Sequence, residues 1–216
     1  MVFDMDGTLV VFKFDGKGAR RAIIQELASM GFDVEGLEGL GPTQAVVDAA
    51  EEQVRDGAVG LDFPTVRSRI YAILDKFETA DREGRSAFPG TRSTLRYLAS
   101  KDVRLAVLTN SGRASTTDAL SRAGIADMFE FVLTRDEVKS MKPDANGVTK
   151  ALSLLRLPQS SVTYVGDSVY DITAAKSVGL KVVSVATGNY SEERLKAEGA
   201  DQVLRSITEL PGALGV

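Results

Sequence analysis

Met1-Val-Phe-Asp-Met-Asp-Gly-Thr-Leu-Val10 opens the chain, and the rest of the sequence can be arranged around it. Residues 1–3 are apolar and predict the end of a buried strand, while Gly7 predicts a turn that ends it. Because side chains alternate between the two faces of a strand, we expect Asp4 and Asp6 to point the same way. The stretch therefore predicts two carboxylates at the end of one buried strand.

Two carboxylates in this arrangement repel each other unless a cation lies between them. At an effective dielectric of about 20, two unit charges ~4 Å apart repel by roughly 4 kcal/mol. A divalent metal removes this repulsion, and hard oxygen ligands suit Mg²⁺. A strand that ends in a solvated acidic turn would also explain Asp4 and Asp6 alone, but the Gly7-Thr8 that follows them favours a functional site.

Length and composition bound the kind of protein. The 216 residues suffice for one domain of ordinary size plus a smaller one, and 44% hydrophobic with 26% charged residues is typical of a soluble globular chain. A net charge of −4 gives no electrostatic reason to expect nucleic acid or an anionic membrane as partner. No apolar run approaches the ~20 residues of a membrane span, and no signal-peptide pattern opens the chain, so we expect a cytoplasmic location.

The sequence contains no cysteine and no histidine. It therefore offers no disulfide, thiol nucleophile or thiolate metal site, and no Ser-His or Cys-His pair. The lack of both residue types also argues against zinc. Catalysis would have to rely on carboxylates, lysines and hydroxyls.

A helical segment follows the first strand directly. Apolar residues recur at helical spacing, bordered by Gly or Pro, in three stretches: 19–30, 42–55 and 64–83. No strand pattern occurs between residues 13 and 87. We interpret 13–87 as an all-α cap inserted into a core formed by 1–12 and 88–216.

Beyond Gly90 the pattern alternates between helix and strand. Strands are predicted at 103–108, 129–133, 162–165, 181–185 and 201–204. Helices are predicted at 91–100, 115–123, 144–157, 172–178 and 191–198, followed by a C-terminal helix. Strands separated by helical crossovers form a parallel sheet covered on both faces. The predicted fold class is therefore α/β, with a Rossmann-like core and an inserted helical cap.

Three of the predicted strands end in polar residues, which the parallel arrangement brings to one edge of the sheet. Asp4 and Asp6 follow the first strand, Thr109-Asn110-Ser111 the second, and Gly166-Asp167 the fourth. In such sheets ligands bind beyond the carboxyl ends of the strands. Asp171 lies one helical turn after Asp167, so both carboxylates can face one spot.

Each of these features also has a plain structural interpretation. Asp167 could cap a helix, Thr109-Asn110-Ser111 could be a capping turn, and Lys142 could be a solvated surface residue. Together, however, they supply a nucleophile, an acid and base, metal ligands, a lysine and anion donors. Phosphoryl transfer to a carboxylate requires this combination.

The chain resembles the haloacid dehalogenase-like (HAD) hydrolase superfamily, and within it the phosphoglycolate phosphatase-like branch with a helical cap. The resemblance covers essentially the whole chain and rests on four motifs in the family's order. These are Asp4-Met-Asp-Gly-Thr-Leu-Val10, Leu108-Thr-Asn-Ser111, Lys142-Pro143 and Gly166-Asp-Ser-Val-Tyr-Asp171.

The resemblance implies hydrolysis of a small phosphomonoester, either phosphoglycolate-like or a sugar phosphate, through a phosphoaspartate. Asp4 would be the nucleophile, and Asp6 would protonate the leaving oxygen and then activate water. Thr109 and the Asn110 N–H would bind phosphate oxygens. Lys142 would offset the negative charge on Asp4 and the phosphate.

The resemblance also implies Mg²⁺ as the cofactor. The Asp4 carboxylate, the Asp6 backbone carbonyl and Asp167 would hold the ion. Asp171 would support that shell and orient Lys142. The supporting residues are thus Asp171, Gly166 and Ser168.

Two features depart from the family pattern. Val10-Val11-Phe12 stands where relatives usually carry a polar Asp-Ser pair, which affects the loop expected to gate the cap. Only three residues precede Asp4, whereas a strand usually has about 5–6 residues. We therefore expect a few additional apolar N-terminal residues to raise thermal stability. In the cap, basic residues could meet a substrate carboxylate or form a solvated face: Arg20, Arg21, Arg67, Arg69 and Lys76.

Other activities on the same fold remain open. A phosphomutase of the β-phosphoglucomutase type would share all four motifs, whereas a dehalogenase normally lacks the second aspartate, Asp6. A pyrophosphatase or a nucleotidase on the same fold is another alternative. A non-catalytic binding protein is a further alternative. The expected partner is a small-molecule phosphomonoester, and the motifs do not specify the oligomeric state.

Overall fold

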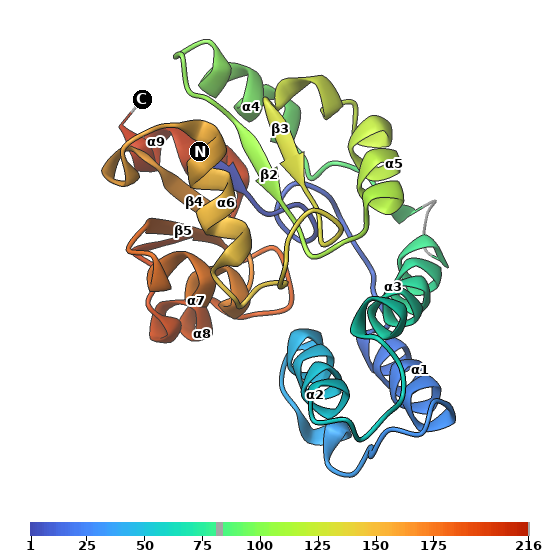
Figure 1. Cartoon of the computed structure of the whole chain (residues 1–216). Coiled ribbons are helices and arrows are strands. Elements are labelled where there is room, and N and C mark those ends of the chain that lie inside the picture. Colours follow the sequence, from blue (N-terminus) through green and yellow to red (C-terminus); the bar gives the residue numbers. More distant parts are fainter. Residues whose placement is uncertain (81–83, 216) are drawn as a thin grey trace. The chain divides into compact units, whose positions relative to one another are not determined.

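The structure of the chain is a computed structural model that describes residues 1–80 and 84–215 (Figure 1). It divides into two compact units. One, the α/β unit, comprises residues 1–12 and 82–216, and the other, the helical unit, comprises residues 13–81.

The α/β unit is built on a parallel sheet in the order β3-β2-β1-β4-β5-β6, which confirms the predicted fold class. The strands are β1 (Val2–Phe3), β2 (Ala106–Leu108), β3 (Phe131–Leu133), β4 (Thr163–Gly166), β5 (Lys181–Val185) and β6 (Gln202–Leu204). Val2 of β1 pairs with Ala106 of β2 and with Tyr164 of β4. The strand order reverses between β1 and β4, and ligands bind beyond the carboxyl ends of strands at such a point.

Helices connect the strands of this unit, as the sequence predicts, with ends that differ by a few residues. They are α4 (Thr91–Ala99), α5 (Arg113–Ala123), α6 (Asn146–Leu155), α7 (Val169–Ser177), α8 (Glu192–Glu198) and α9 (Leu210–Leu214). Short 3-10 turns are η3 (Ala126–Met128), η4 (Gln159–Ser161) and η5 (Ile207–Glu209).

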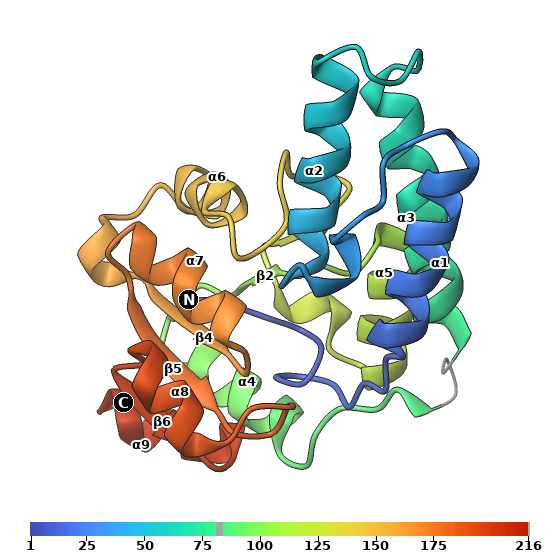
Figure 2. The same cartoon turned by 90° about the horizontal axis from the view of Figure 1, so that it is seen from below.

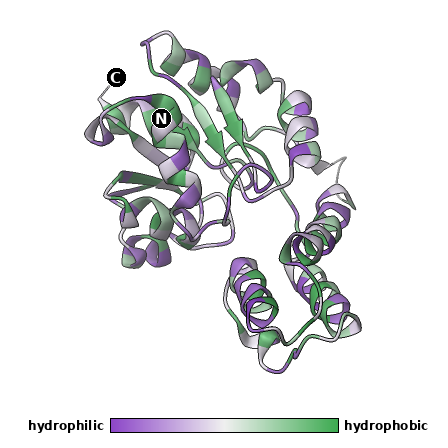
Figure 3. Ribbon diagram, viewed as in Figure 1, coloured by the Kyte–Doolittle hydropathy of each residue, from purple (hydrophilic) through white to green (hydrophobic). Residues whose placement is uncertain are grey.

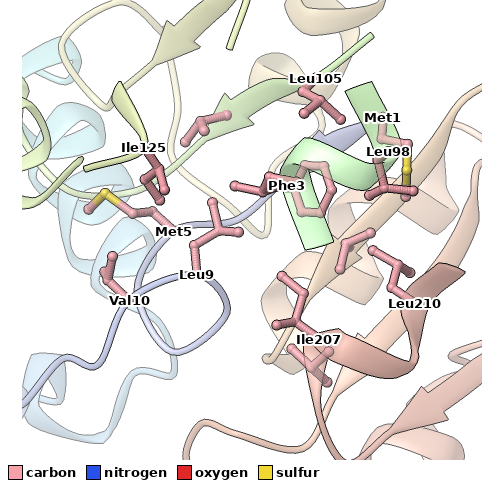
Figure 4. Close-up of a cluster of buried hydrophobic side chains, with 14 of the residues drawn as sticks. Met1, Phe3, Met5, Leu9, Val10, Leu98, Leu105, Ile125, Ile207 and Leu210 are labelled. Atoms are coloured by element: carbon pink, nitrogen blue, oxygen red, sulfur yellow. The ribbon is translucent and has the colours of Figure 1, made fainter. Parts of the chain in front are cut away.

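Alternation along the strands divides the apolar core into two layers, one on each face of the sheet. Phe3 and Val107 pack with α4, α5 and α9 in one layer, which Figure 4 shows in close-up. Their neighbours Val2 and Tyr164 pack with α6, α7 and α8 in the other layer. Figure 3 shows the hydrophobic colour gathered along the strands, as expected for a sheet buried on both faces.

The helical unit contains α1 (Gly16–Ser29), the turn η1 (Leu37–Gly39), α2 (Thr43–Arg55) and α3 (Phe63–Ala80). Helix α3 packs against both α1 and α2 (Figure 2). The end of the third helix was predicted at residue 83, and residues 81–83 lie outside the described residues. Among the residues that the structure describes, none of the helices has the length and apolar character needed to cross a membrane.

The segments that flank the helical unit pair with each other inside the α/β unit. Val11 N–H donates to the Ser86 carbonyl at 2.8 Å, within a short antiparallel pairing. We call the paired residues 9–12 and 85–88 the neck. Because the returning half of the neck belongs to the α/β unit, the helical unit ends before the residue 87 expected from the sequence.

Candidate active site

Asp4 lies directly after β1, where the sheet fixes the backbone. Its N–H donates to the carbonyl of Val165 in β4 at 2.8 Å, and its side chain is buried. Lys142 Nζ donates to Asp4 Oδ1 at 2.6 Å. Burial raises the pKa of Asp4, and the charge of Lys142 opposes this rise. Asp4 therefore depends on nearby cations to stay ionised.

Oxygen atoms from three further residues hold the Lys142 ammonium. It donates to Asp171 Oδ1 at 2.6 Å, and to the Tyr164 hydroxyl and the Leu108 carbonyl at 3.2 Å each. Burial alone would lower the pKa of Lys142, but the charges of Asp171 and Asp4 outweigh it and raise the pKa well above its usual value. The lysine is thus a fixed positive charge beside Asp4.

Asp171 uses its two oxygens for different tasks. Oδ1 accepts from Lys142, while Oδ2 accepts from Ser168 Oγ at 2.6 Å and from the Ser168 N–H at 3.1 Å. The Asp171 N–H donates in return to Ser168 Oγ at 3.2 Å, which forms a capping box. A Cβ at Gly166 would lie 2.5 Å from Asp171 Cγ, so this close approach requires glycine.

The capping box corrects two details of the sequence analysis. Helix α7 begins at Val169, earlier than the expected Ile172, and its N-cap is Ser168. The alternative in which Asp167 caps this helix is therefore wrong. Because Ser168 caps α7, the Asp167 carboxylate is available for contacts outside this helix.

Asp167 brings a third carboxylate to Asp4 and Asp171. One oxygen from each of the three lies within 4.8 Å of the others. Burial raises the pKa of Asp167 to about 7, and the charge of Asp171 is the next cause. Three buried carboxylates around one lysine repel one another unless a further cation or a proton joins them.

The donor set of this cluster fits a hard divalent cation, because it consists of carboxylate oxygens. Asp167 Oδ1 accepts from Thr8 Oγ1 at 2.9 Å. Asp167 Oδ2 faces two glycines: a Cβ on Gly7 would lie 2.5 Å from it, and one on Gly188 1.7 Å. These glycines leave space around the oxygen that any side chain would remove.

The same contacts separate the ligands from the residues that support them. Both oxygens of Asp171 are already engaged, by Lys142 and Ser168. Asp4 and Asp167 are therefore the two carboxylates that would hold an ion directly, and Asp171 would orient the lysine beside it.

Asp6 points to this edge of the sheet for a reason other than strand alternation. Strand β1 already ends at Phe3. The Met5 carbonyl then accepts hydrogen bonds from the N–H groups of residues 8–10, which forms a tight turn. This turn sets the direction of the Asp6 side chain. The alternation of side chains along a strand does not apply to Asp6, because this residue lies beyond the end of β1.

The Asp6 carboxylate contacts a second group of residues. Its Oδ2 accepts from Ser111 Oγ at 2.6 Å and from Thr109 Oγ1 at 3.4 Å, and its Oδ1 lies 3.7 Å from Arg85 Nη2. Burial raises the pKa of Asp6, while the charge of Arg85 and the Ser111 hydrogen bond oppose the rise. An acid with a raised pKa can hold a proton for a leaving group.

Asn110 connects the end of β2 to the segment that carries Lys142. Its Nδ2 donates to the Lys142 carbonyl and its Oδ1 accepts from the Lys142 N–H, both at 2.9 Å. Next to it, Thr109 Oγ1 accepts from the Ser111 N–H at 3.1 Å. The side chain of Asn110 therefore positions the lysine, a task that the sequence alone did not indicate.

The structure thus brings residues of the first, third and fourth motifs into one buried cluster: Asp4, Lys142, Asp167 and Asp171. Asp6 lies beside this cluster, in contact with Thr109 and Ser111 of the second motif. Sequence reasoning missed three residues of the site: Arg85, Tyr164 and Gly188. Tyr164 could have been noticed, since it stands in a strand two positions before Gly166. Arg85 belongs to no motif and lay inside the segment interpreted as cap, so no pattern indicated it.

Comparison with known proteins agrees with these observations. A family model described as haloacid dehalogenase-like hydrolase matches residues 1–185. The plasmid phosphoglycolate phosphatase of Cupriavidus necator is 31% identical, over 99% of this chain and 92% of the relative. The phosphoglycolate phosphatase of Caulobacter vibrioides is 29% identical, over 99% and 89%.

A solved structure with 22% identity, of a predicted phosphatase from Clostridium acetobutylicum, has the same fold. Its TM-score is 0.68, and the match covers 100% of this chain and 97% of that one. The chain therefore belongs to the haloacid dehalogenase-like hydrolase family, as its four motifs predict.

Proposed function

We propose that the chain hydrolyses a small phosphomonoester in two steps at Asp4, with Mg²⁺ bound by Asp4 and Asp167. The observation that carries this proposal is the Lys142 ammonium, 2.6 Å from an oxygen of Asp4 and 2.6 Å from one of Asp171. An anionic nucleophile that approaches a phosphate dianion gains little without such cationic help.

In the first step an oxygen of Asp4 attacks phosphorus, and the bond from phosphorus to the leaving oxygen breaks. Asp6, in its acid form, transfers its proton to that oxygen, which departs as an alcohol. Lys142, Thr109 and the Asn110 N–H bind the oxygens of the transferred group. The raised pKa of the buried Asp6 supports its role as acid.

In the second step the Asp6 carboxylate takes a proton from water while the water oxygen attacks phosphorus. The bond between phosphorus and Asp4 then breaks, phosphate leaves, and Asp6 is again protonated. Mg²⁺, when bound, supplies positive charge to the phosphate oxygens and lowers the pKa of Asp4. The Asp6 backbone carbonyl is proposed as a further ligand.

The relatives' names support a phosphoglycolate-like substrate, with a sugar phosphate as the second possibility. We propose that the helical unit is the cap that selects between them. Several of its basic residues have partners within that unit. Arg20 Nη1 donates to the Leu40 carbonyl at 2.6 Å, and Arg69 pairs with Glu26 at 2.9 Å. Arg67 Cζ lies 5.8 Å from the centre of the Phe63 ring in the same unit, so Arg21 and Lys76 are the better candidates for a substrate carboxylate.

A panel of phosphorylated acids, sugars and nucleotides, assayed with Mg²⁺ and again with EDTA, tests the proposal. We expect phosphate release from small phosphomonoesters that EDTA abolishes and added Mg²⁺ restores. Transfer of the phosphoryl group to a second sugar hydroxyl would identify a mutase instead. Absence of turnover on the whole panel would favour a binding protein.

A further inference from the structure

Arg85 is a buried cation that the proposed mechanism leaves unused. It lies in the returning half of the neck and is only 4% exposed. Its Nη2 lies 3.7 Å from Asp6 Oδ1, and both side chains are largely shielded from solvent. Burying an arginine whose charge is not compensated by a partner is destabilising. The contacts of the Arg85 guanidinium must therefore offset the cost of its burial.

Contacts on two sides fix the Arg85 guanidinium. Nη1 donates to Ser115 Oγ at 2.6 Å and approaches the Ser115 carbonyl at 3.3 Å. The Cζ atom lies 4.0 Å from the centre of the Phe12 ring, in the outgoing half of the neck. A cation stacked on an aromatic ring and anchored to the first turn of α5 has little freedom to turn.

The Asp6 carboxylate is held between this guanidinium and a hydroxyl. Oδ2 accepts the short hydrogen bond from Ser111, whereas Oδ1 faces Arg85 without a hydrogen bond. Within the described residues, Asp6 Oδ1 and the Nε and Nη2 of Arg85 are buried side-chain atoms that lack a hydrogen-bond partner. The ion pair therefore attracts Oδ1 and leaves it able to accept or donate a proton.

We propose that Arg85 is a positioning residue for Asp6, holding the carboxylate so that Oδ1 exchanges protons with the leaving oxygen and then with water. The inference rests on the proposed function, in which Asp6 is the acid and base. It gives the neck a part in the reaction, since Arg85 and Phe12 come from its two halves. Ser115 and Phe12 act only through Arg85.

Comparing two classes of substrate separates this role from a structural one. p-Nitrophenolate leaves phosphorus without being protonated, whereas an alkoxide requires the Asp6 proton. In Arg85→Met we expect a burst of about one p-nitrophenolate per enzyme from p-nitrophenyl phosphate, followed by turnover roughly 100-fold below wild type. With an alkyl phosphomonoester that the wild type hydrolyses, the same variant should lose at least as much kcat and show no burst.

Three further variants make the comparison specific. Arg85→Lys should regain part of the lost kcat. Ser115→Ala should show the same burst as Arg85→Met but a smaller loss of kcat. Arg92→Met removes an arginine of the same unit that donates to the Ala123 carbonyl, and it should keep wild-type kcat with both substrates. In an Asp6→Asn background, Arg85→Met should cause no further loss, because coupled residues are not additive.

Wild-type kcat in Arg85→Met, an equal loss on both substrates without a burst, or full additivity with Asp6→Asn would each overturn the proposal. These results leave the proposed function intact as long as wild-type protein still forms a phosphoenzyme. A wild-type protein that never forms one would overturn both.

Discussion

Lys142 Nζ and Asp4 Oδ1 lie 2.6 Å apart, although 138 positions separate the two residues in the sequence. The parallel sheet accounts for this proximity, because it brings the carboxyl ends of β1 and β2 together and Asn110 ties the Lys142 backbone to the end of β2. The lysine charge is therefore part of the surroundings of Asp4, the proposed nucleophile, before any substrate binds.

Replacement of Lys142 should reduce catalysis more than it reduces folding. Lys142→Met removes the positive charge beside Asp4, and loss of one such electrostatic contact typically costs about 10²–10³ in kcat. In EDTA the variant should also lose about 3–5 kcal/mol of stability, because the carboxylates of Asp4 and Asp171 remain buried without their partner. Steady-state kinetics and urea unfolding measure the two effects. Lys101→Met, on the surface beside Tyr97, is the matched control and should change neither.

The Tyr164 hydroxyl should contribute to catalysis and to stability because it helps to hold Lys142 in place. Tyr164→Phe removes only the oxygen that lies 3.2 Å from Lys142 Nζ and 3.0 Å from Asp171 Oδ1. Since hydrogen bonds to charged groups contribute about 1.5–3 kcal/mol, we expect roughly a tenfold lower kcat and a lowered melting temperature. Tyr97→Phe, at an exposed position, should match wild type in both measurements. An unchanged kcat in Tyr164→Phe would show that the Tyr164 hydroxyl is not needed to hold Lys142 in place.

Gly188→Ala should weaken metal binding specifically. A Cβ at this position would lie 1.7 Å from Asp167 Oδ2, so the carboxylate would have to move. Shifting a ligand in this way should raise the Kd for Mg²⁺ by roughly 10- to 100-fold, as measured by titration calorimetry. Gly212→Ala is the control, because its Cβ would meet no atom within 4 Å. An unaltered Kd in Gly188→Ala would argue against Asp167 as a ligand.

The stability of the metal-free protein should fall as the pH rises toward neutrality. Burial raises the pKa of Asp167 from 3.8 to about 7, so the folded state binds this proton more tightly than the unfolded state does. Protonation therefore stabilises the fold, and that stabilisation decreases between about pH 4 and pH 7. Mg²⁺ should remove the loss, and a concentration of 100 Kd should add about 2.7 kcal/mol.

Thermal unfolding in EDTA and in Mg²⁺ across this pH range measures both effects. Asp167→Asn should show a weaker pH dependence, because the raised pKa values of Asp4 and Asp6 remain, and it should gain little from Mg²⁺. A metal-free wild-type protein whose stability instead rises steadily from pH 4 to pH 7 would contradict the assignment.

The sequence predicted the sheet and the meeting of its motifs because both depend on regular patterns. Alternating helix and strand runs identify a parallel sheet, and residues such as Asp4 and Asp167 follow strand ends that such a sheet aligns. The predicted start of α7 is wrong because the N-cap of this helix, Ser168, is set by its side-chain contacts with Asp171 rather than by apolar spacing.

Other parts of the site could not be predicted, since nothing local distinguishes them. Arg85 has ordinary neighbours in the sequence, and only the pairing of the neck brings it to Asp6. Gly188 matters because of a close approach to Asp167, which lies on another strand end. The direction of Asp6 follows from the turn at Met5 and not from the strand before it.

The most direct test of the account is to identify the residue that becomes phosphorylated during turnover. Wild-type protein mixed with substrate and Mg²⁺, quenched in acid within one turnover and analysed by peptide mass spectrometry, should carry an acid-stable, base-labile phosphoryl group on Asp4. Asp4→Asn should carry none and show no turnover while it keeps a cooperative unfolding transition. Phosphate found on another residue, or full turnover by Asp4→Asn, would contradict the account.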